Sequence, residues 1–560
     1  MTALIPVTLQ APGFLGLNTQ DSAIGIDFQW GLVADNCVFD DTGRISARKG
    51  FNKITSSAVT GDIEQVFEYK ESATSKRIIS SANAKLYEGT TTLTEKQGSL
   101  TPSNNDWKFL DFKNKCLAWQ AGEEPITKTG SSNFTTIQAG HTDWQASTAY
   151  AVHDCVKATS SANPTMYFVC TTAGTTAGSE PTWTTTDLGS TTDNTAVWKT
   201  VIIPQGNEAL SAYGRVWAVT ENKTGIKYSA LLDETKFDSG NGGGDIDMLA
   251  VWVGGSDTIE ALAAFNDRLI IFGKGSIVIY ASPNAPTNLA IEDIIGGIGC
   301  TARDSVQDVG TDLLFLSQDG VRSFSRTVLQ ETLPLQDISK KVKDELVSLA
   351  ASSIATVQSV YSPDEGFYLL RTGMFTWCLD LKKPSQESFA RVTRWNGIPI
   401  KSMTYASDGT LYFGGVGMIG SYSGYNDIAA SYIMAYKSPW VDFSSKDPAV
   451  STRLKIPKKL RATIYGGFAY SITFLYAFDF NSPTTFSVST PVGSTAATEY
   501  GIGEYGIGEY SGGAQAIATV AAGLGKSGQH LQFGYSVTIN GNPIAFQKID
   551  LLMKLGRSIN

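Results

Sequence analysis

The sequence has little of what metal sites and disulfide frameworks need. Only three histidines occur among the 560 residues, which argues against a multi-histidine metal centre. The six cysteines are scattered and form no CxxC pair, so we expect buried free thiols in a reducing compartment rather than disulfides. We therefore expect no metal and no other cofactor.

Membrane, export and catalytic signals are also missing. No run approaches the roughly 18 apolar residues that span a bilayer, and the start, MTALIPVTLQAPGF, lacks the basic and apolar regions of a secretory signal. No GxSxG, Walker or HExxH motif occurs, and SDGTLYF at 407–413 is an isolated, partial match to the boxes of propeller sialidases. A pair of carboxylic acids for glycoside cleavage would be brought together only by folding, so the sequence leaves this activity open. We expect no enzyme and assign no catalytic residue.

What the chain does contain is glycine, aromatic residues and an excess of acid. Its 55 glycines suit tight turns, and its 26 phenylalanines and 22 tyrosines suit strands rather than helices. The formal charge of −9 argues against a wide phosphate-binding surface, although a protein past which DNA slides without adhering is compatible with it. Composition and length together predict an all-β protein with several domains.

Hairpins follow one another between Leu210 and Arg326. Polar turns with Gly, Asn or Asp separate short apolar runs, which is the local signal for antiparallel hairpins. The units recur at roughly 45–55 residues, the spacing of four-stranded propeller blades. We predict a β-propeller of about six blades, with its first blades in residues 51–139 and the others in residues 201–437.

The composition changes between residues 140 and 200. This stretch is rich in Thr, Ser and Ala, and we interpret it as a small β module inserted into a propeller loop. Its pattern resembles the small β modules of chitin-binding domains and insertions in phage tail proteins. Its aromatic residues form either a sugar-stacking surface or the core of the module. The candidates for glycan contact are Trp144, Tyr150, Trp183 and Trp198.

One helix and a terminal domain complete the pattern. Residues 335–352 predict a helix that Asp337 or Ser339 can cap, and that packs on the propeller or contacts a partner. From residue 438 the alternating runs lengthen, so residues 438–560 predict a β-sandwich or platform. The apolar stripe of the helix consists of Ile338, Val342, Leu346 and Leu349.

The first fifty residues carry a basic turn. Glycines break residues 1–50 into short pieces that cannot bury much alone, so we expect an extended docking segment. Arg44, Arg48 and Lys49 follow the turn DDTGR and are predicted to be exposed. They either contact a partner or are simply solvated.

The run EYGIGEYGIGEYSGG at 499–513 repeats every five residues. An odd period cannot keep one side chain on one face of a strand, so the glycines predict turns or bulges. If copies of the chain surround a channel, Glu499, Glu504 and Glu509 would form carboxylate rings that repel passing phosphates. The alternative is a solvated loop with no special role.

An ordered set of motifs resembles one known family. GxNTxxS near the start, AxNxxFD at 34–40 and GRxxxRxGF at 43–51 are followed by similar stretches at 212–237, 298–326 and 528–557. Together these stretches resemble the tail tubular or nozzle proteins of short-tailed bacteriophages, including those called packaged-DNA stabilisation proteins. The resemblance extends over about four-fifths of the chain.

The resemblance implies a structural role in the virion. A homohexameric ring below the head–tail adaptor would retain packaged DNA and conduct it during ejection, with tail fibres or spikes docked nearby. The protein would be made in the host cytoplasm and end in the viral tail. The adaptor-docking candidates are Arg44, Arg48, Lys49, Lys554 and Arg557. The alternative is a carbohydrate-binding adhesin or glycan-degrading tail protein that binds a host surface glycan through the module.

Overall fold

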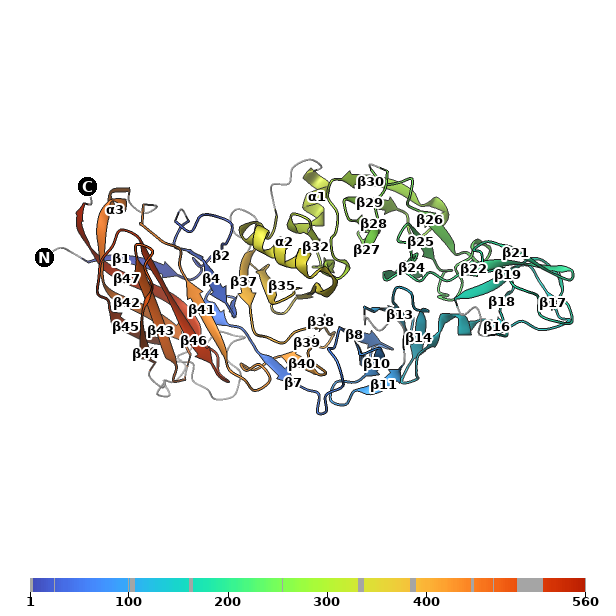
Figure 1. Ribbon diagram of the computed structural model, residues 1–560, viewed down its shortest axis with the longest axis horizontal. Helices are drawn as coiled ribbons and strands as arrows, with labels where there is room; N and C mark the ends of the chain where they lie inside the picture. The colour runs from blue at the N-terminus through green and yellow to red at the C-terminus, as the bar shows by residue number, and fades with distance from the viewer. Residues whose placement is uncertain are drawn as a thin grey trace.

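The computed structural model shows an elongated molecule with a ring of small sheets in the middle, a module at one end and a β platform at the other (Figure 1). Strands make up almost all of its regular structure. The structure describes residues 4–24, 26–98, 100, 106–160, 165–253, 255–330, 337–382, 389–444, 448–466, 468–490 and 517–558.

The ring consists of sets of short antiparallel strands in sequence order. Four of them are complete four-stranded sheets: β8–β11 (Gln65–Lys70, Lys76–Ala82, Lys85–Glu88, Thr94–Gln97), β12–β15 (Lys108–Phe112, Lys115–Trp119, Ile126–Thr129, Thr135–Thr136), β23–β26 (Ala209–Ala212, Arg215–Val219, Gly225–Tyr228, Gly244–Asp247) and β27–β30 (Ile259–Phe265, Arg268–Gly273, Ser276–Ala281, Ala290–Gly296). The turn between β27 and β28 shows why the hairpins are tight. Asn266 and Asp267 both have positive φ, which these two residue types tolerate better than most.

Three further sets continue round the ring, so the described chain has seven where the sequence predicted about six. They are β31–β33 (Gln307–Asp308, Leu313–Ser317, Gly320–Ser323), β34–β37 (Gln358–Ser362, Phe367–Thr372, Phe375–Asp380, Arg391–Trp395) and β38–β40 (Ser402–Tyr405, Leu411–Gly414, Ile419–Tyr422) joined by β7 (Phe51–Lys53). The β31–β33 set has only three strands, and the four strands β34–β37 are part of a larger sheet.

The ring is closed by strands from distant parts of the sequence. The first strand of one set lies beside the first strand of the next, as in β8 beside β12, β23 beside β27 and β34 beside β38. The last set lies beside the first, because β38 contacts β8. The strand β7, which precedes β8, pairs with β40 of the last set. The fold is therefore nearly all-β and propeller-like, which confirms the predicted class.

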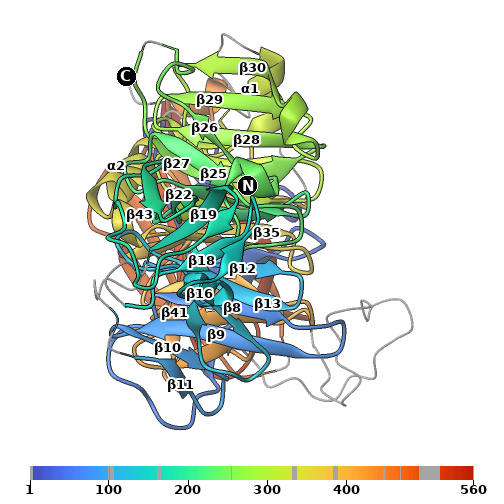
Figure 2. The same ribbon diagram turned by 90° about the vertical axis from the view of Figure 1, so that its right-hand side faces the viewer.

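The module is inserted between β15 and β23, and in Figure 2 its strands β16, β18, β19 and β22 face the viewer. Its five-stranded sheet has the order β16 (Thr142–Asp143), β18 (Cys155–Lys157), β19 (Met166–Thr172), β22 (Ala196–Ile202) and β21 (Ser190–Asp193), and β17 (Ala149–Tyr150) pairs with β20 (Gly174–Thr175). It follows the 3₁₀ helix η1 (Ile137–Gly140). Tyr167, Val169 and Val201 lie in the same apolar cluster as Trp119 and Val216 of the ring. The module is thus anchored to two sets of the ring by a shared core.

The platform consists of two large sheets. One has the order β45 (Ile517–Gly523), β42 (Arg453–Tyr465), β47 (Ala545–Ser558), β6 (Ile45–Ala47) and β5 (Cys37–Phe39), with β1 (Ile5–Gln10) also pairing with β47. The other continues from β37 of the ring through β4 (Val33–Asp35), β41 (Tyr432–Lys437), β46 (Leu531–Ile539), β43 (Ser471–Phe478) and β44 (Thr484–Ser489). Side chains of both sheets, such as Ile549 and Val537, share one core.

Residues 4–50 are part of the platform rather than an extended docking segment. Their short strands β1 to β6, which include β2 (Gly16–Leu17) and β3 (Trp30–Gly31), pair with β47, β37 and β41. Each piece is too short to fold alone, as the glycines indicated. The strands β1, β2, β4 and β6 pair with longer strands, while β3 pairs with β2 and β5 with β6. The prediction of a separate segment was therefore wrong.

The predicted helix is shorter than expected. The helix α2 (Lys343–Ser352) follows a 3₁₀ turn at Lys340–Val342, and neither proposed cap acts as one. Ser339 Oγ instead accepts a hydrogen bond from the backbone N–H of Val321. The stripe does pack on the protein itself, because Ile338, Val342 and Leu346 are buried and Leu349 lies against the same core. A second helix, α1 (Phe324–Gln330), and the short α3 (Pro448–Ser451) were not predicted.

A buried arginine joins the ring to the platform. Arg48 lies between β6 and β7 and is fully buried. Its Nη1 and Nη2 donate to the two carboxylate oxygens of Asp427 at 2.9 and 2.6 Å, and its Nε donates to Asn36 Oδ1 at 3.0 Å. The Asp427 carboxylate also accepts from the Phe51 N–H at the start of β7. This bidentate pair fixes the strand that closes the ring.

Arg48→Met should lower the free energy of unfolding by about 3–5 kcal/mol, because the Asp427 carboxylate would stay buried without its cation. Lys49→Met is the matched control. Lys49 lies 2.6 Å from Glu365 but its side chain is 42% exposed, so its loss should cost less than about 1 kcal/mol. Urea denaturation followed by circular dichroism measures both. Equal effects would contradict the role of Arg48, and Asp427→Asn should recover part of the loss in the Arg48→Met background.

Candidate functional site: a charged cluster at the centre of the ring

Side chains from several sets of the ring converge on Asp304, in the 3₁₀ helix η4 (Arg303–Ser305) before β31. Its Oδ2 accepts hydrogen bonds from Gln65 Nε2 of β8 and Gln358 Nε2 of β34, both at 3.2 Å. Lys108 Nζ of β12 lies 4.0 Å from its Oδ1. Asp304 precedes the set that begins with β31, which is not a neighbour of the set that begins with β8. A hydrogen bond between Asp304 and Gln65 of β8 therefore lies near the centre of the ring.

Arg303 extends the cluster to the loops before β12 and β23. Its Nη2 lies 2.7 Å from Asp304 Oδ2 and 2.6 Å from Asp106 Oδ1. Its Nη1 donates to the Asn207 carbonyl at 2.6 Å, and its Nε lies 3.7 Å from Glu208 Oε2. A planar guanidinium has five N–H donors in a fixed fork, which suits a residue that joins several strands at once.

Of the carboxylates in the cluster, Glu208 has the least favourable hydrogen-bond partners. Its side chain is 1% exposed, and neither oxygen accepts a well-aligned hydrogen bond from the described residues, although Lys108 Nζ lies 3.2 Å from Oε2. Burial raises the pKa of Glu208 to about 7, against the opposing charges of Lys108 and Arg303. For Asp304, burial raises the pKa too, but Arg303 outweighs it and the net pKa lies below its ordinary value. The two acids therefore hold protons in different pH ranges.

This arrangement cross-links the ring and can hold or release one proton. A carboxyl with a pKa near 7 is what general acid catalysis uses, but here Arg303 and Lys108 lie beside the acids and the amides of Gln65 and Gln358 complete the contacts. The cluster supports a structural role better than a catalytic one.

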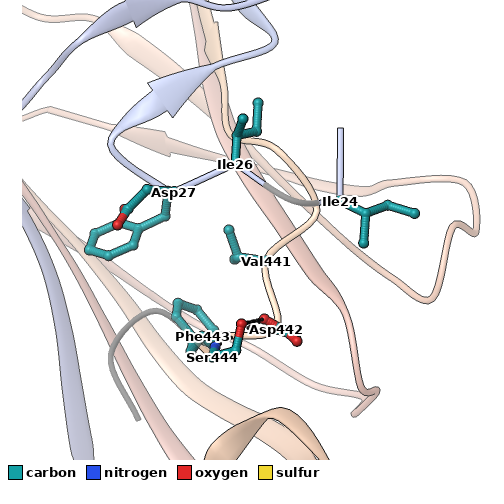
Figure 3. Close-up of a pocket in the computed structure, with 8 residues that line it drawn as sticks. Ile24, Ile26, Asp27, Val441, Asp442, Phe443 and Ser444 are labelled. Atoms are coloured by element: carbon teal, nitrogen blue, oxygen red, sulfur yellow. Dashed lines mark hydrogen bonds between the residues drawn. The ribbon is translucent and has the colours of Figure 1, made fainter. Parts of the chain in front are cut away.

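A small cleft lies elsewhere, between the N-terminal residues and the loop after β41 (Figure 3). It is lined by Ile24, Ile26, Asp27, Phe28, Val441, Asp442, Phe443 and Ser444. Asp442 is already engaged, because it accepts hydrogen bonds from Ser444 and Ser451. Burial raises its pKa, but these hydrogen bonds outweigh burial and lower it to about 2. The other acid of the cleft, Asp27, accepts a hydrogen bond from the backbone N–H of Gln29, so both acids already have partners within the protein.

The tryptophans predicted to contact glycans form the core of the module. Trp144, Trp183 and Trp198 are 5%, 9% and 0% exposed. Asp193 Oδ2 accepts the indole N–H groups of Trp144 and Trp198 at 2.8 and 3.2 Å. A module of this size needs large buried side chains, so the glycan-contact prediction is wrong for these three residues.

Tyr150 is the remaining glycan candidate. It is only partly buried and packs edge-on against Trp198, with ring centroids 5.0 Å apart. Its hydroxyl accepts a hydrogen bond from the backbone N–H of Gln145 at 3.1 Å. A single half-buried tyrosine is a small stacking surface for a sugar.

The predicted docking residues divide into two groups. Arg44 and Arg48 are 4% and 0% exposed and pair with Asp40 and Asp427, so the expectation that they lie on an exposed turn was wrong. The turn is short and packed against the platform, and its cations therefore meet internal carboxylates. Lys49 is partly exposed and pairs with Glu365. Lys554 and Arg557 lie on β47, half-exposed and exposed.

The channel-lining candidates Glu499, Glu504 and Glu509 lie outside the described residues. Within the described ranges, no three His, Cys, Asp or Glu side chains gather as metal ligands would. The helices of the described chain are too short or too polar to cross a membrane.

Sequence patterns did not indicate the central cluster. Lys108, Glu208 and Arg303 are separated by about a hundred residues each, so no local spacing links them. The one available signal was the charged pair Arg303–Asp304 inside the otherwise apolar IGCTARDS stretch that belongs to the family resemblance.

Glu208→Gln should change the pH dependence of stability. The folded protein keeps a proton on Glu208 up to about pH 7, whereas the unfolded chain releases it near 4.5. The wild-type free energy of unfolding should therefore fall, relative to that of Glu208→Gln, by on the order of 3 kcal/mol as the pH rises through that window. Urea titrations at several pH values measure this. Glu221→Gln, on an exposed turn, is the control. A difference between wild type and the Glu208→Gln variant that does not depend on pH would contradict the assignment.

Comparison with known proteins does not show a family for this chain. No family model and no curated protein matches the chain. Among solved structures, PorZ, a surface component of the type-IX secretion system of Porphyromonas gingivalis, is 12% identical over 78% of this chain and 46% of its own, with a TM-score of 0.32. YCF48 bound to D1 peptide is 12% identical over 69% of this chain and 100% of its own (TM-score 0.25). The Pan2 WD40 domain of Neurospora crassa is 10% identical over 67% and 95% (TM-score 0.26). With such scores, the assignment of the fold rests on the order of the sheets themselves.

Proposed function

We propose that the chain is a structural subunit of the short tail of a bacteriophage. Copies of it form a ring, a homohexamer, below the head–tail adaptor, retain the packaged DNA and conduct it during ejection. Tail fibres or spikes dock nearby, and the mature protein resides in the tail of the virion. It is not an enzyme.

The observation that carries this proposal is where the family-like motifs meet in the fold. Asn36 of AxNxxFD and Arg48 of GRxxxRxGF bond each other at the junction of ring and platform. The stretch at 528–557 supplies β46 and most of β47, which pair with strands of the first fifty residues and with β41. Motifs at opposite ends of the sequence thus build one junction, as expected if the resemblance reflects a shared architecture.

The mechanical role is supported by the stiffness of the chain. We propose that its seven sets are the blades of one closed propeller, fastened at the centre by the charged cluster and at the rim by Arg48. The second platform sheet is continuous with β37 of the ring, so ring and platform form one body. Because side chains occupy the centre of the propeller, DNA would pass through the middle of a ring of copies and not through a single chain.

The alternative, a glycan-binding or glycan-degrading tail protein, has less support. It needs exposed aromatic faces, and three of its four candidates are buried in the core of the module. The module does lie at the end of the molecule opposite the platform, which suits contact with something outside the tail (Figure 1).

Negative-stain imaging of the purified protein tests the proposal. We expect rings or short tubes with a central hole, because flat-sided β bodies that contact one another head to tail close into rings. Isolated monomers at every salt and protein concentration would contradict it. A pull-down with chitin and other host glycans is the second arm, and binding that Tyr150→Ala abolishes would favour the alternative.

A further inference from the structure

The positive charge of this acidic protein is concentrated in one sheet. The strands β1, β5, β6, β42, β45 and β47 contain eight Lys or Arg residues and one acid, Asp550. The formal charge of the whole chain is −9, so the residues outside this sheet carry −16. The described strands of the second platform sheet that follow residue 430 contain one charged residue, Lys437. The excess of cations is therefore specific to the first sheet and is not a general property of the platform.

Strand alternation places most of these cations on the outer face. Along β42, Leu460, Ala462 and Ile464 are buried in the platform core, so Lys459 and Arg461 point the other way. Along β47, Ile549, Leu551 and Met553 are buried, and Lys548, Leu552 and Lys554 alternate with them. In the paired strands, Lys459 lies opposite Leu552 and Arg461 opposite Asp550.

Few of the outward charges are neutralised within the chain. Asp550 already has Lys548 at 3.1 Å and the Thr8 hydroxyl at 2.7 Å. No ion pair within the described residues involves Lys458, Lys459, Arg461, Lys554 or Arg557. Two other cations are used internally, since Lys455 donates to the Ser451 carbonyl and Arg453 to the Gly556 carbonyl. The face therefore presents five cations without an acidic partner.

The face approaches the size of a standard protein interface. The strands β1, β42, β45 and β47 have 6, 13, 7 and 14 residues, which at about 3.3 Å per residue and about 4.8 Å between strands cover roughly 630 Å². A standard interface buries about 800 Å² on each partner. Pro6 and Leu552 lie opposite each other among these cations, so the face also offers apolar area to a protein partner. Figure 1 shows β1, β42, β45 and β47 at the end of the molecule away from the module.

We propose that this basic face, defined by Lys458, Lys459, Arg461, Lys554 and Arg557, binds an acidic surface of a second copy of the chain. The excess of −16 outside the sheet supplies the complementary charge on every copy. A contact between two different surfaces is head-to-tail. A copy that binds through its acidic surface still has its basic face free, so the contact can repeat from copy to copy. Complementary charge would mainly set the rate and register of this association. The inference rests on the proposed function, because both require copies to assemble.

Sedimentation velocity of the full chain at low and high salt tests the contact. Wild type should self-associate in about 20 mM NaCl, and about 500 mM NaCl should raise Kd at least about tenfold. Lys459→Glu/Arg461→Glu/Lys554→Glu should abolish association at low salt. The matched control is Lys53→Glu/Lys76→Glu/Lys199→Glu, on the ring and module, which also changes the formal charge from −9 to −15 and should associate like wild type. Circular dichroism and the neutral triple Gln variant distinguish misfolding from a lost contact.

Three results would overturn the inference. They are absence of wild-type association at low salt, equal association of the two triple Glu variants, and binding of a short duplex DNA by wild type that the basic-face variant loses. The test separates this inference from the proposed function. Rings that persist in the basic-face variant would reject the contact but keep the tail function, whereas a salt-sensitive dimer without rings would keep the contact and reject the tail ring.

Discussion

The bidentate pair between Arg48 and Asp427 is the contact on which the architecture most depends. A guanidinium without solvent exposure needs a carboxylate partner. Here that partner comes from the loop between β40 of the ring and β41 of the platform. The same carboxylate accepts the N–H of Phe51, where β7 begins. One buried pair therefore sets the start of the ring-closing strand, the path of the N-terminal residues and the attachment of the platform.

The charged side chains at the centre of the ring are also buried and paired with opposite charges, but they have more partners than Arg48. Propeller-like rings bring the first strand of every set together, and polar side chains there must satisfy one another because little water reaches them. Arg303 and Asp304 do so by bonding residues of β8, β12 and β34. A ring held at its centre and closed at its rim resists deformation, as the proposed conduit for packaged DNA would require. The same contacts make the centre of a single chain an unsuitable path for DNA.

Positive charge is distributed unevenly along the length of the molecule. The module end, with its core of tryptophans anchored by Asp193, carries no concentration of cations among its described residues, whereas the platform end has a basic face on an otherwise acidic protein. A body with one basic end and an acidic remainder favours ordered association over random aggregation, since like faces repel. This asymmetry connects the platform to the proposed tail ring more directly than the glutamate-rich run at 499–513 does.

The sequence alone determined the fold class, because alternating apolar residues and Asn, Asp or Gly turns act locally, as at Asn266 and Asp267. It also indicated the module between residues 140 and 200 and the apolar stripe from Ile338 to Leu346. Only the tertiary structure decided which charges are internal. Arg48 looked like part of an exposed basic turn because its partner, Asp427, lies hundreds of residues away. Trp144 and Trp198 looked like a sugar-binding surface because their burial depends on how the strands of the module pack together. The central cluster and the basic face were hidden for the same reason. Tertiary contacts, not spacing along the chain, bring Lys108 to Asp304, and strand pairing places the cations of β42 beside those of β47.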